Sequence, residues 1–112
     1  MYICLHSCGC IGTLMPQIIE AGFDAWEGQD RANDKKAIMD QYGKDLAQCT
    51  LYIIPEDMSD EDAIADIHKR VDDLGSTGRF ACRLRDSKVG RDVNLAEELY
   101  RYSRSKYLDM AK

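Results

Sequence analysis

The feature of this sequence that most constrains its fold is a fourfold alternation of short β-prone runs with longer stretches of helical spacing. The β-prone runs cover residues 2–6, 23–26, 50–54 and 79–84. This βαβαβαβα order is typical of parallel strands that are joined by right-handed helical crossovers. The sequence therefore predicts an α/β fold with a parallel sheet, in which four βα units form either a small open sheet or half of a larger structure.

Local signals mark where the helices begin and end. The clearest helical pattern covers residues 60–74, because Ser59 is a suitable N-cap, Asp62 completes a capping box and Gly75 follows the last apolar residue. Its apolar positions recur at helical spacing: Ile64, Ile67, Val71 and Leu74.

Shorter helices are predicted elsewhere from the same kinds of signal. One covers residues 14–21, a second follows a cap at Asn33 or Asp34, and a third follows a cap at Asn94. Each of these stretches comes after a β-prone run, as the alternating order requires.

Length and charge exclude several classes of protein. The 112 residues fit one domain, residues 1–112, and a composition of 45% apolar and 31% charged residues is typical of a globular protein. The net charge is −5 and the 15 Lys and Arg residues are scattered, which argues against a nucleic-acid partner. No apolar run approaches the roughly 18 residues of a membrane helix, and no signal peptide is indicated. We therefore expect a cytoplasmic protein with reduced thiols.

The end of the first β-prone run carries the densest group of reactive side chains. His6 and Cys8 are two residues apart, so an extended strand would direct both to one face, at the end where βα proteins place their sites. Imidazole and thiolate are zinc ligands, and Cys82 in the fourth run is the predicted third ligand. This set would leave a fourth coordination position open, as in catalytic zinc sites. Cys10 is the rival third ligand.

Other candidate residues have less specific surroundings. Glu27 ends the second run and could be a ligand, a general acid or a hydrogen-bonding group, or an ordinary solvated residue. Cys4 and Cys49 are predicted to be ordinary core residues, and His68 to lie at the solvated edge of its helix. The five cations between residues 79 and 91 could meet an anionic substrate, although an ordinary solvated loop is the favoured interpretation.

Three segments together resemble the C-terminal half of the uroporphyrinogen decarboxylase superfamily. They are residues 5–9 (LHSCG), 18–27 (IIEAGFDAWE) and 42–46 (YGKDL). The later predicted helices follow in the expected order, so the resemblance covers almost the whole chain. It implies that the four βα units correspond to the C-terminal half of a TIM (β/α)8 barrel and form a single partial-barrel domain.

The same resemblance implies a choice of activities. One branch of the superfamily decarboxylates uroporphyrinogen III in porphyrin biosynthesis without a metal or cofactor. The other comprises cobalamin-dependent methyltransferases, in which zinc held by a His-x-Cys…Cys pattern activates a thiol for methyl transfer from a methyl-corrinoid. His6 and Cys8 match the first two ligand positions and Cys82 falls at the last, which places the chain nearer this branch. The implied cofactor is Zn²⁺, with the methyl-corrinoid carried as a co-substrate by a partner corrinoid protein.

The family's enzymes are much longer than this chain, which implies a fragment or truncated homologue that is inactive alone. A second copy of the chain, or a separate N-terminal half, would complete the barrel, because a half-barrel exposes the edges of its outer strands. The remaining alternative is a non-catalytic half-barrel that serves as an interaction module.

Overall fold

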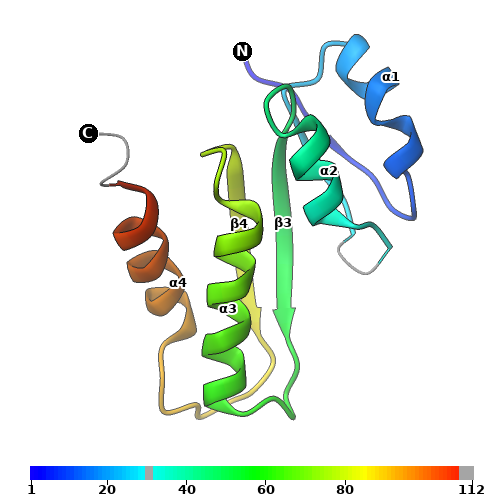
Figure 1. Ribbon diagram of the computed structural model, residues 1–112. Coiled ribbons are helices and arrows are strands. Elements are labelled where there is room, and N and C mark those ends of the chain that lie inside the picture. The colour runs from blue at the N-terminus through cyan, green and yellow to red at the C-terminus, as the bar shows by residue number, and fades with distance from the viewer. Residues whose placement is uncertain (30–31, 109–112) are drawn as a thin grey trace. The chain divides into compact units, whose positions relative to one another are not determined.

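The computed structural model describes residues 1–29 and 32–108 and confirms an α/β fold with a four-stranded parallel sheet (Figure 1). The strands, which lie in the order of the chain, are β1 (Cys4–His6), β2 (Ala25–Glu27), β3 (Ala47–Ile54) and β4 (Phe80–Asp86). The helices are α1 (Met15–Glu20), α2 (Lys35–Tyr42), α3 (Asp60–Leu74) and α4 (Leu95–Ser103), with short turns η1 (Gly12–Leu14) and η2 (Arg104–Leu108). Over these described ranges, none of the helices combines the length and apolar character that crossing a membrane requires.

The strand register divides the side chains of the sheet between two faces. Trp26 of β2 pairs with Gln48 of β3, whereas the next residue, Glu27, pairs with His6 of β1 and Cys49 of β3. Side chains alternate along a strand, so Trp26 and Gln48 share one face and the other three residues share the opposite face. Every second residue of β3 from Gln48 onward is buried, and the residues between them are half-buried or exposed. We call these two faces the covered face and the open face.

The chain forms two compact units. Unit 1 comprises Met1–Leu51 and Arg79–Arg83, and unit 2 comprises Tyr52–Gly78 and Leu84–Lys112. Strands β3 and β4 therefore contribute residues to both units.

Trp26 is the centre of the core of unit 1. Its side chain is fully buried, and its indole Nε1 donates a hydrogen bond of 2.8 Å to Oγ of Ser7. The ammonium group of Lys35 lies 4.3 Å from the centroid of the indole ring. The apolar side chains of this core come from α1, α2 and the turn before β3: Met15, Ile18, Ile38 and Leu46. Both helices of unit 1 thus lie on the covered face of the sheet.

Helix α3 of unit 2 has the predicted bounds and the predicted N-cap. The hydroxyl oxygen of Ser59 accepts a hydrogen bond of 3.1 Å from the backbone N–H of Asp62. One face of the helix is buried, and it comprises Ala63, Ile67, Val71 and Leu74. The guanidinium group of Arg70 lies 3.9 Å from the ring centroid of Tyr52, which is a buried residue of β3. Helix α3 therefore packs on the covered face of β3.

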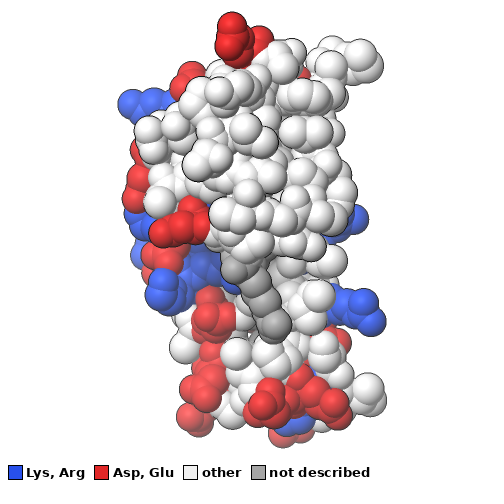
Figure 2. Space-filling model, turned by 90° about the vertical axis from the view of Figure 1, so that its right-hand side faces the viewer, with Lys and Arg blue, Asp and Glu red and all other residues white. Residues whose placement is uncertain are grey.

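Acidic side chains gather at the N-terminal end of α3. The first turn carries Asp60, Glu61 and Asp62, where carboxylates interact favourably with the positive end of the helix dipole. Figure 2 shows acidic residues grouped at the lower end of that view, the end at which Figure 1 places the start of α3. The three carboxylates of the first turn are explained by stabilisation of the helix start.

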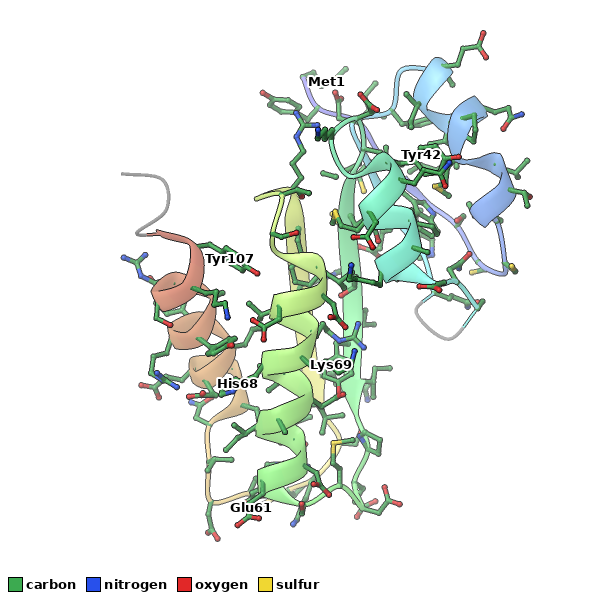
Figure 3. The ribbon with its side chains drawn as sticks, in the orientation of Figure 1. Met1, Tyr42, Glu61, His68, Lys69 and Tyr107 are labelled. Atoms are coloured by element: carbon green, nitrogen blue, oxygen red, sulfur yellow. The ribbon has the colours of Figure 1, made fainter. Side chains whose placement is uncertain are left out.

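Helices α3 and α4 lie side by side and are joined by a polar cluster around His68 (Figure 3). Nε2 of His68 lies 2.6 Å from Oε1 of Glu98, and its ring stacks on Tyr102 with 3.8 Å between centroids. Arg101 donates hydrogen bonds to both carboxylate oxygens of Glu98. The hydrogen bonds from Arg101 and then from His68 lower the pKa of Glu98 to about 2. His68 thus lies at a helix–helix contact, with 32% of its side chain still exposed at the edge of the helix.

This cluster predicts a specific acid sensitivity. The pKa of Glu98 is about 2 in the folded chain and near 4.5 without these partners, so its stabilising effect is present above pH 4.5 and is lost as the pH falls towards 2. Replacing Glu98 with glutamine should flatten the dependence of unfolding free energy on pH between these values, measured by urea denaturation. The exposed Glu97→Gln variant is the control and should keep the wild-type slope, and an identical slope in both variants would contradict the assignment.

The observed strands differ at their ends from the predicted runs. Strand β3 begins at Ala47 rather than at residue 50, and β4 continues to Asp86 rather than ending at residue 84. At Ala47 the backbone N–H donates to the carbonyl oxygen of Asp24 at 2.9 Å, and the N–H of Ser87 donates to Ile54 at 3.1 Å. Pairing with a distant strand therefore sets these ends, and such pairing has no local sequence signal.

Candidate functional site

The open face of unit 1 carries a cluster of charged and titratable side chains at the ends of adjacent strands. His6 ends β1, Glu27 ends β2, and Cys49 lies beside Glu27 in β3. Arg83 of β4 reaches the same carboxylate. We call His6, Glu27 and Arg83 the open-face cluster.

Glu27 is the centre of the open-face cluster. Its Oε1 lies 3.2 Å from Nδ1 of His6, and Arg83 donates from one terminal nitrogen to Oε1 at 2.9 Å and to Oε2 at 2.7 Å. Burial acts to raise the pKa of Glu27, but the hydrogen bonds and positive charge of Arg83, together with the contact to His6, outweigh it and lower that pKa below its ordinary value. Glu27 is therefore ionised at neutral pH.

An ionised Glu27 can orient His6 but is unsuited to donate a proton. A carboxylate that contacts one nitrogen of an imidazole fixes the orientation of the ring and directs the other nitrogen towards a proton or a metal. His6 presents 66% of its side chain to solvent, so the imidazole ring is accessible to a ligand. Of the roles predicted for Glu27, the geometry favours a hydrogen-bonding, positioning role over that of general acid.

The loop after β1 carries Cys8 and Cys10, and it is held by two polar side chains from the segment after β2. The backbone N–H of Gly9 donates to Oε1 of Gln29 at 2.9 Å, and Nδ2 of Asn33 donates to the Gly9 carbonyl at 2.9 Å. Gly9 has φ of 80°, a conformation that glycine adopts without steric cost. Both cysteines are exposed, on a loop with a defined path.

The structure does not bring Cys82 to His6. Cys82 contacts Oγ1 of Thr50 at 3.5 Å, and Thr50 lies on the covered face, whereas the neighbouring Arg83 extends over the open face to Glu27. Strands β1 and β4 are also the two opposite edges of the sheet. Within the part of the chain that is described, no three His, Cys, Asp or Glu side chains are grouped so as to hold a metal ion. The geometry therefore separates Cys82 from His6, and zinc ligation by His6 and Cys8 with Cys82 or Cys10 stays a prediction.

Comparisons of the chain with protein-family models, curated proteins and solved structures find no match. Membership of the uroporphyrinogen decarboxylase superfamily therefore stays a prediction from the sequence. The chemistry of the site is inferred from its own geometry.

Sequence reasoning missed two features of this face. Arg83 was considered only as part of a basic run, but it is the main partner of Glu27. Cys4 was predicted to be a core residue and is exposed, and Cys49 is only partly buried, because both lie on the open face. The alternation of residues does place Cys4 with His6 and Arg83 opposite Cys82, but it does not show which face the helices cover.

Proposed function

We propose that this chain is one half of a divided α/β barrel and acts as an assembly module whose partner is a second copy of itself. The observation that carries the proposal is the open face. Leu51 and Ile53, two successive outward residues of β3, are 45% and 48% exposed. Parallel sheets are ordinarily covered on both faces, so an apolar open face favours a partner that encloses it.

The strand order supports a second copy as that partner. Strands β1 to β4 lie in chain order, which leaves β1 and β4 as the two edges. A (β/α)8 barrel has eight parallel strands with its helices outside. Helices α1 and α2 pack around Trp26 in unit 1, and α3 packs against Tyr52, a buried residue of β3, in unit 2. Two copies related by a two-fold axis would supply eight strands, with β4 of each copy beside β1 of the other. No edge would then be left unpaired.

Formation of the dimer would also enclose the open-face cluster in the interior of the barrel. His6, Glu27 and Arg83 lie on the face that would become the interior of the barrel. Two copies of the cluster would then face one interior, where exclusion of water strengthens each charge interaction. The chain alone serves as an interaction module, and the imidazole oriented by Glu27 becomes part of a site only in the assembly.

Replacing Leu51 with aspartate should dissociate the assembly. An unpaired carboxylate would have to be buried in the interior, so the dimer dissociation constant should rise by at least about 100-fold. Sedimentation equilibrium across a range of protein concentrations measures this change directly. Because Leu51 is partly exposed within the single chain, the variant should still fold, which circular dichroism checks.

Val89→Asp is the matched control, since it adds the same charge at an apolar residue that is 96% exposed in the loop after β4. This variant should dimerise like the wild type. Equal weakening by both substitutions would show a general charge effect, and a wild-type chain that stays monomeric at several hundred micromolar would overturn self-assembly.

A further inference from the structure

The loop between β1 and η1, residues 7–11, presents two thiols that are separated by a single glycine. Cys8 and Cys10 are both exposed and both free. Gly9 between them has φ of 80°, and the backbone bends at this residue. Two residue steps cover about 7 Å in a fully extended chain, and a bend shortens that span. The two cysteines are therefore close enough for a disulfide, which usually joins Cα atoms about 4.4–6.8 Å apart.

Hydrogen bonds hold this loop at the residues before, between and after the two cysteines. The backbone N–H of Ser7 donates to the carbonyl oxygen of Glu27 at 3.1 Å. Asn33 holds the other two positions: its Nδ2 donates to the Gly9 carbonyl at 2.9 Å, and its Oδ1 accepts from the N–H of Ile11 at 3.0 Å. The bend is thus in place before any reaction, so closing a disulfide across it orders little besides the two side chains.

Solvent access and the presence of a second thiol select the chemistry of this pair. Redox-sensing cysteines are solvent-accessible and often lie next to a second cysteine that resolves the first oxidised product. Cys8 and Cys10 meet both conditions, whereas Cys49 and Cys82 are partly buried within β3 and β4. Exposed disulfides are also the labile ones. The pair therefore suits reversible exchange better than a permanent structural crosslink.

We propose that Cys8 and Cys10 form a redox-active dithiol that exchanges with a low-molecular-weight disulfide of the glutathione type. The thiolate of one cysteine attacks a sulfur of that disulfide, so that a mixed disulfide forms on the protein and one glutathione leaves and takes up a proton. The thiolate of the other cysteine then attacks the sulfur of the first. The intramolecular S–S bond forms, the mixed disulfide breaks, and the second glutathione leaves as a thiol. The protein loses two protons and two electrons, which the two glutathione thiols carry.

This exchange is independent of the proposed dimer. The loop and its hydrogen-bond partners lie within unit 1 of a single chain. A failure of self-assembly therefore leaves the exchange standing. Zinc ligation by Cys8 would compete with it, because both need the same thiolate, so the test includes a chelator.

The test uses the full chain with Cys4 replaced by serine, because Cys4 is another exposed thiol of unit 1. This background is equilibrated at low protein concentration, with EDTA, in buffers that contain reduced and oxidised glutathione at a series of ratios. Acid quenching, alkylation and mass spectrometry of the digested chain then report the state of each thiol. As the oxidised share rises, Cys8 and Cys10 should both be lost to alkylation and should appear as an intramolecular disulfide without bound glutathione. Excess reduced glutathione should restore both thiols.

Adding Cys10→Ser keeps Cys8 but removes the thiol that resolves the mixed disulfide. Cys8 should then retain one glutathione. Adding Cys82→Ser instead is the matched control, since it removes a thiol that contacts Thr50, and it should leave the loop disulfide unchanged. Circular dichroism checks that each variant folds. The proposal is overturned if both loop thiols stay reduced at every ratio, if the background retains glutathione as the Cys10→Ser variant does, or if Cys82→Ser abolishes the disulfide.

Discussion

Replacing Trp26 with alanine should lower the free energy of unfolding by about 4 kcal/mol, the largest effect we expect from any single core substitution. The ring is fully buried, and the Lys35 ammonium lies 4.3 Å from its centroid. Gly28 is also packed against it: a Cβ at that position would lie 2.0 Å from an indole carbon. The shortened side chain would therefore leave a cavity that the surrounding residues fill only partly.

The experiment is urea denaturation followed by circular dichroism, because Trp26 is the only tryptophan and its fluorescence is lost in the variant. Ser7→Ala is the matched control: it removes the acceptor of the indole N–H but keeps the ring, and should cost only about 1 kcal/mol. A loss below about 1 kcal/mol for Trp26→Ala would contradict its central place in unit 1. The substitution should also loosen the end of β1, since Ser7 follows His6 directly.

Replacing Arg91 with methionine should lower the melting temperature by more than about 8 °C. Its side chain is only 3% exposed and connects three segments of unit 2. It donates to Asp86 at the end of β4 (2.7 Å), to Asp60 at the start of α3 (2.9 Å) and to the carbonyl oxygen of Met58 (2.8 Å). Removing it would leave two partly buried carboxylates without this partner, and breaking a buried ion pair from one side is strongly destabilising.

Arg101→Met is the matched control for this substitution. Arg101 also pairs with a carboxylate, that of Glu98, but 61% of its side chain is exposed, and exposed ion pairs contribute little to stability. Differential scanning calorimetry should show a shift of no more than a few degrees for Arg101→Met. Equal shifts in the two variants would mean that burial of Arg91 does not make its ion pairs stronger.

Elements with strong local signals were predictable from the sequence. Helix α3 has both predicted ends because Ser59 caps it and Gly75 follows it, and these signals act within one turn. The start of α2 had two candidate caps. In the structure the cap is Asp34, whose carboxylate accepts a hydrogen bond from the backbone N–H of Ala37. Asn33 instead donates a hydrogen bond to the Gly9 carbonyl in the loop that carries Cys8.

The candidate site was predictable only in part. Alternation along β1 is enough to predict that Cys4 and His6 share a face, but whether that face is covered depends on where the helices pack. The role of Arg91 was likewise not predictable from the sequence, because the basic run around it favoured a solvated loop. Only in the folded chain do Asp60 and Asp86 form ion pairs with Arg91. Long-range pairing of this kind leaves no periodic pattern in the sequence.

The strict alternation of buried and outward residues in β3 has a consequence for how this segment can vary between related proteins. Inserting or deleting one residue within the strand would turn Cys49 and Leu51 inward and Gln48 and Thr50 outward. Inserting or deleting two residues would keep every remaining side chain of the strand on its present face. Length variants of this strand that still fold should therefore differ by even numbers of residues, whereas the surface loops should accept odd changes.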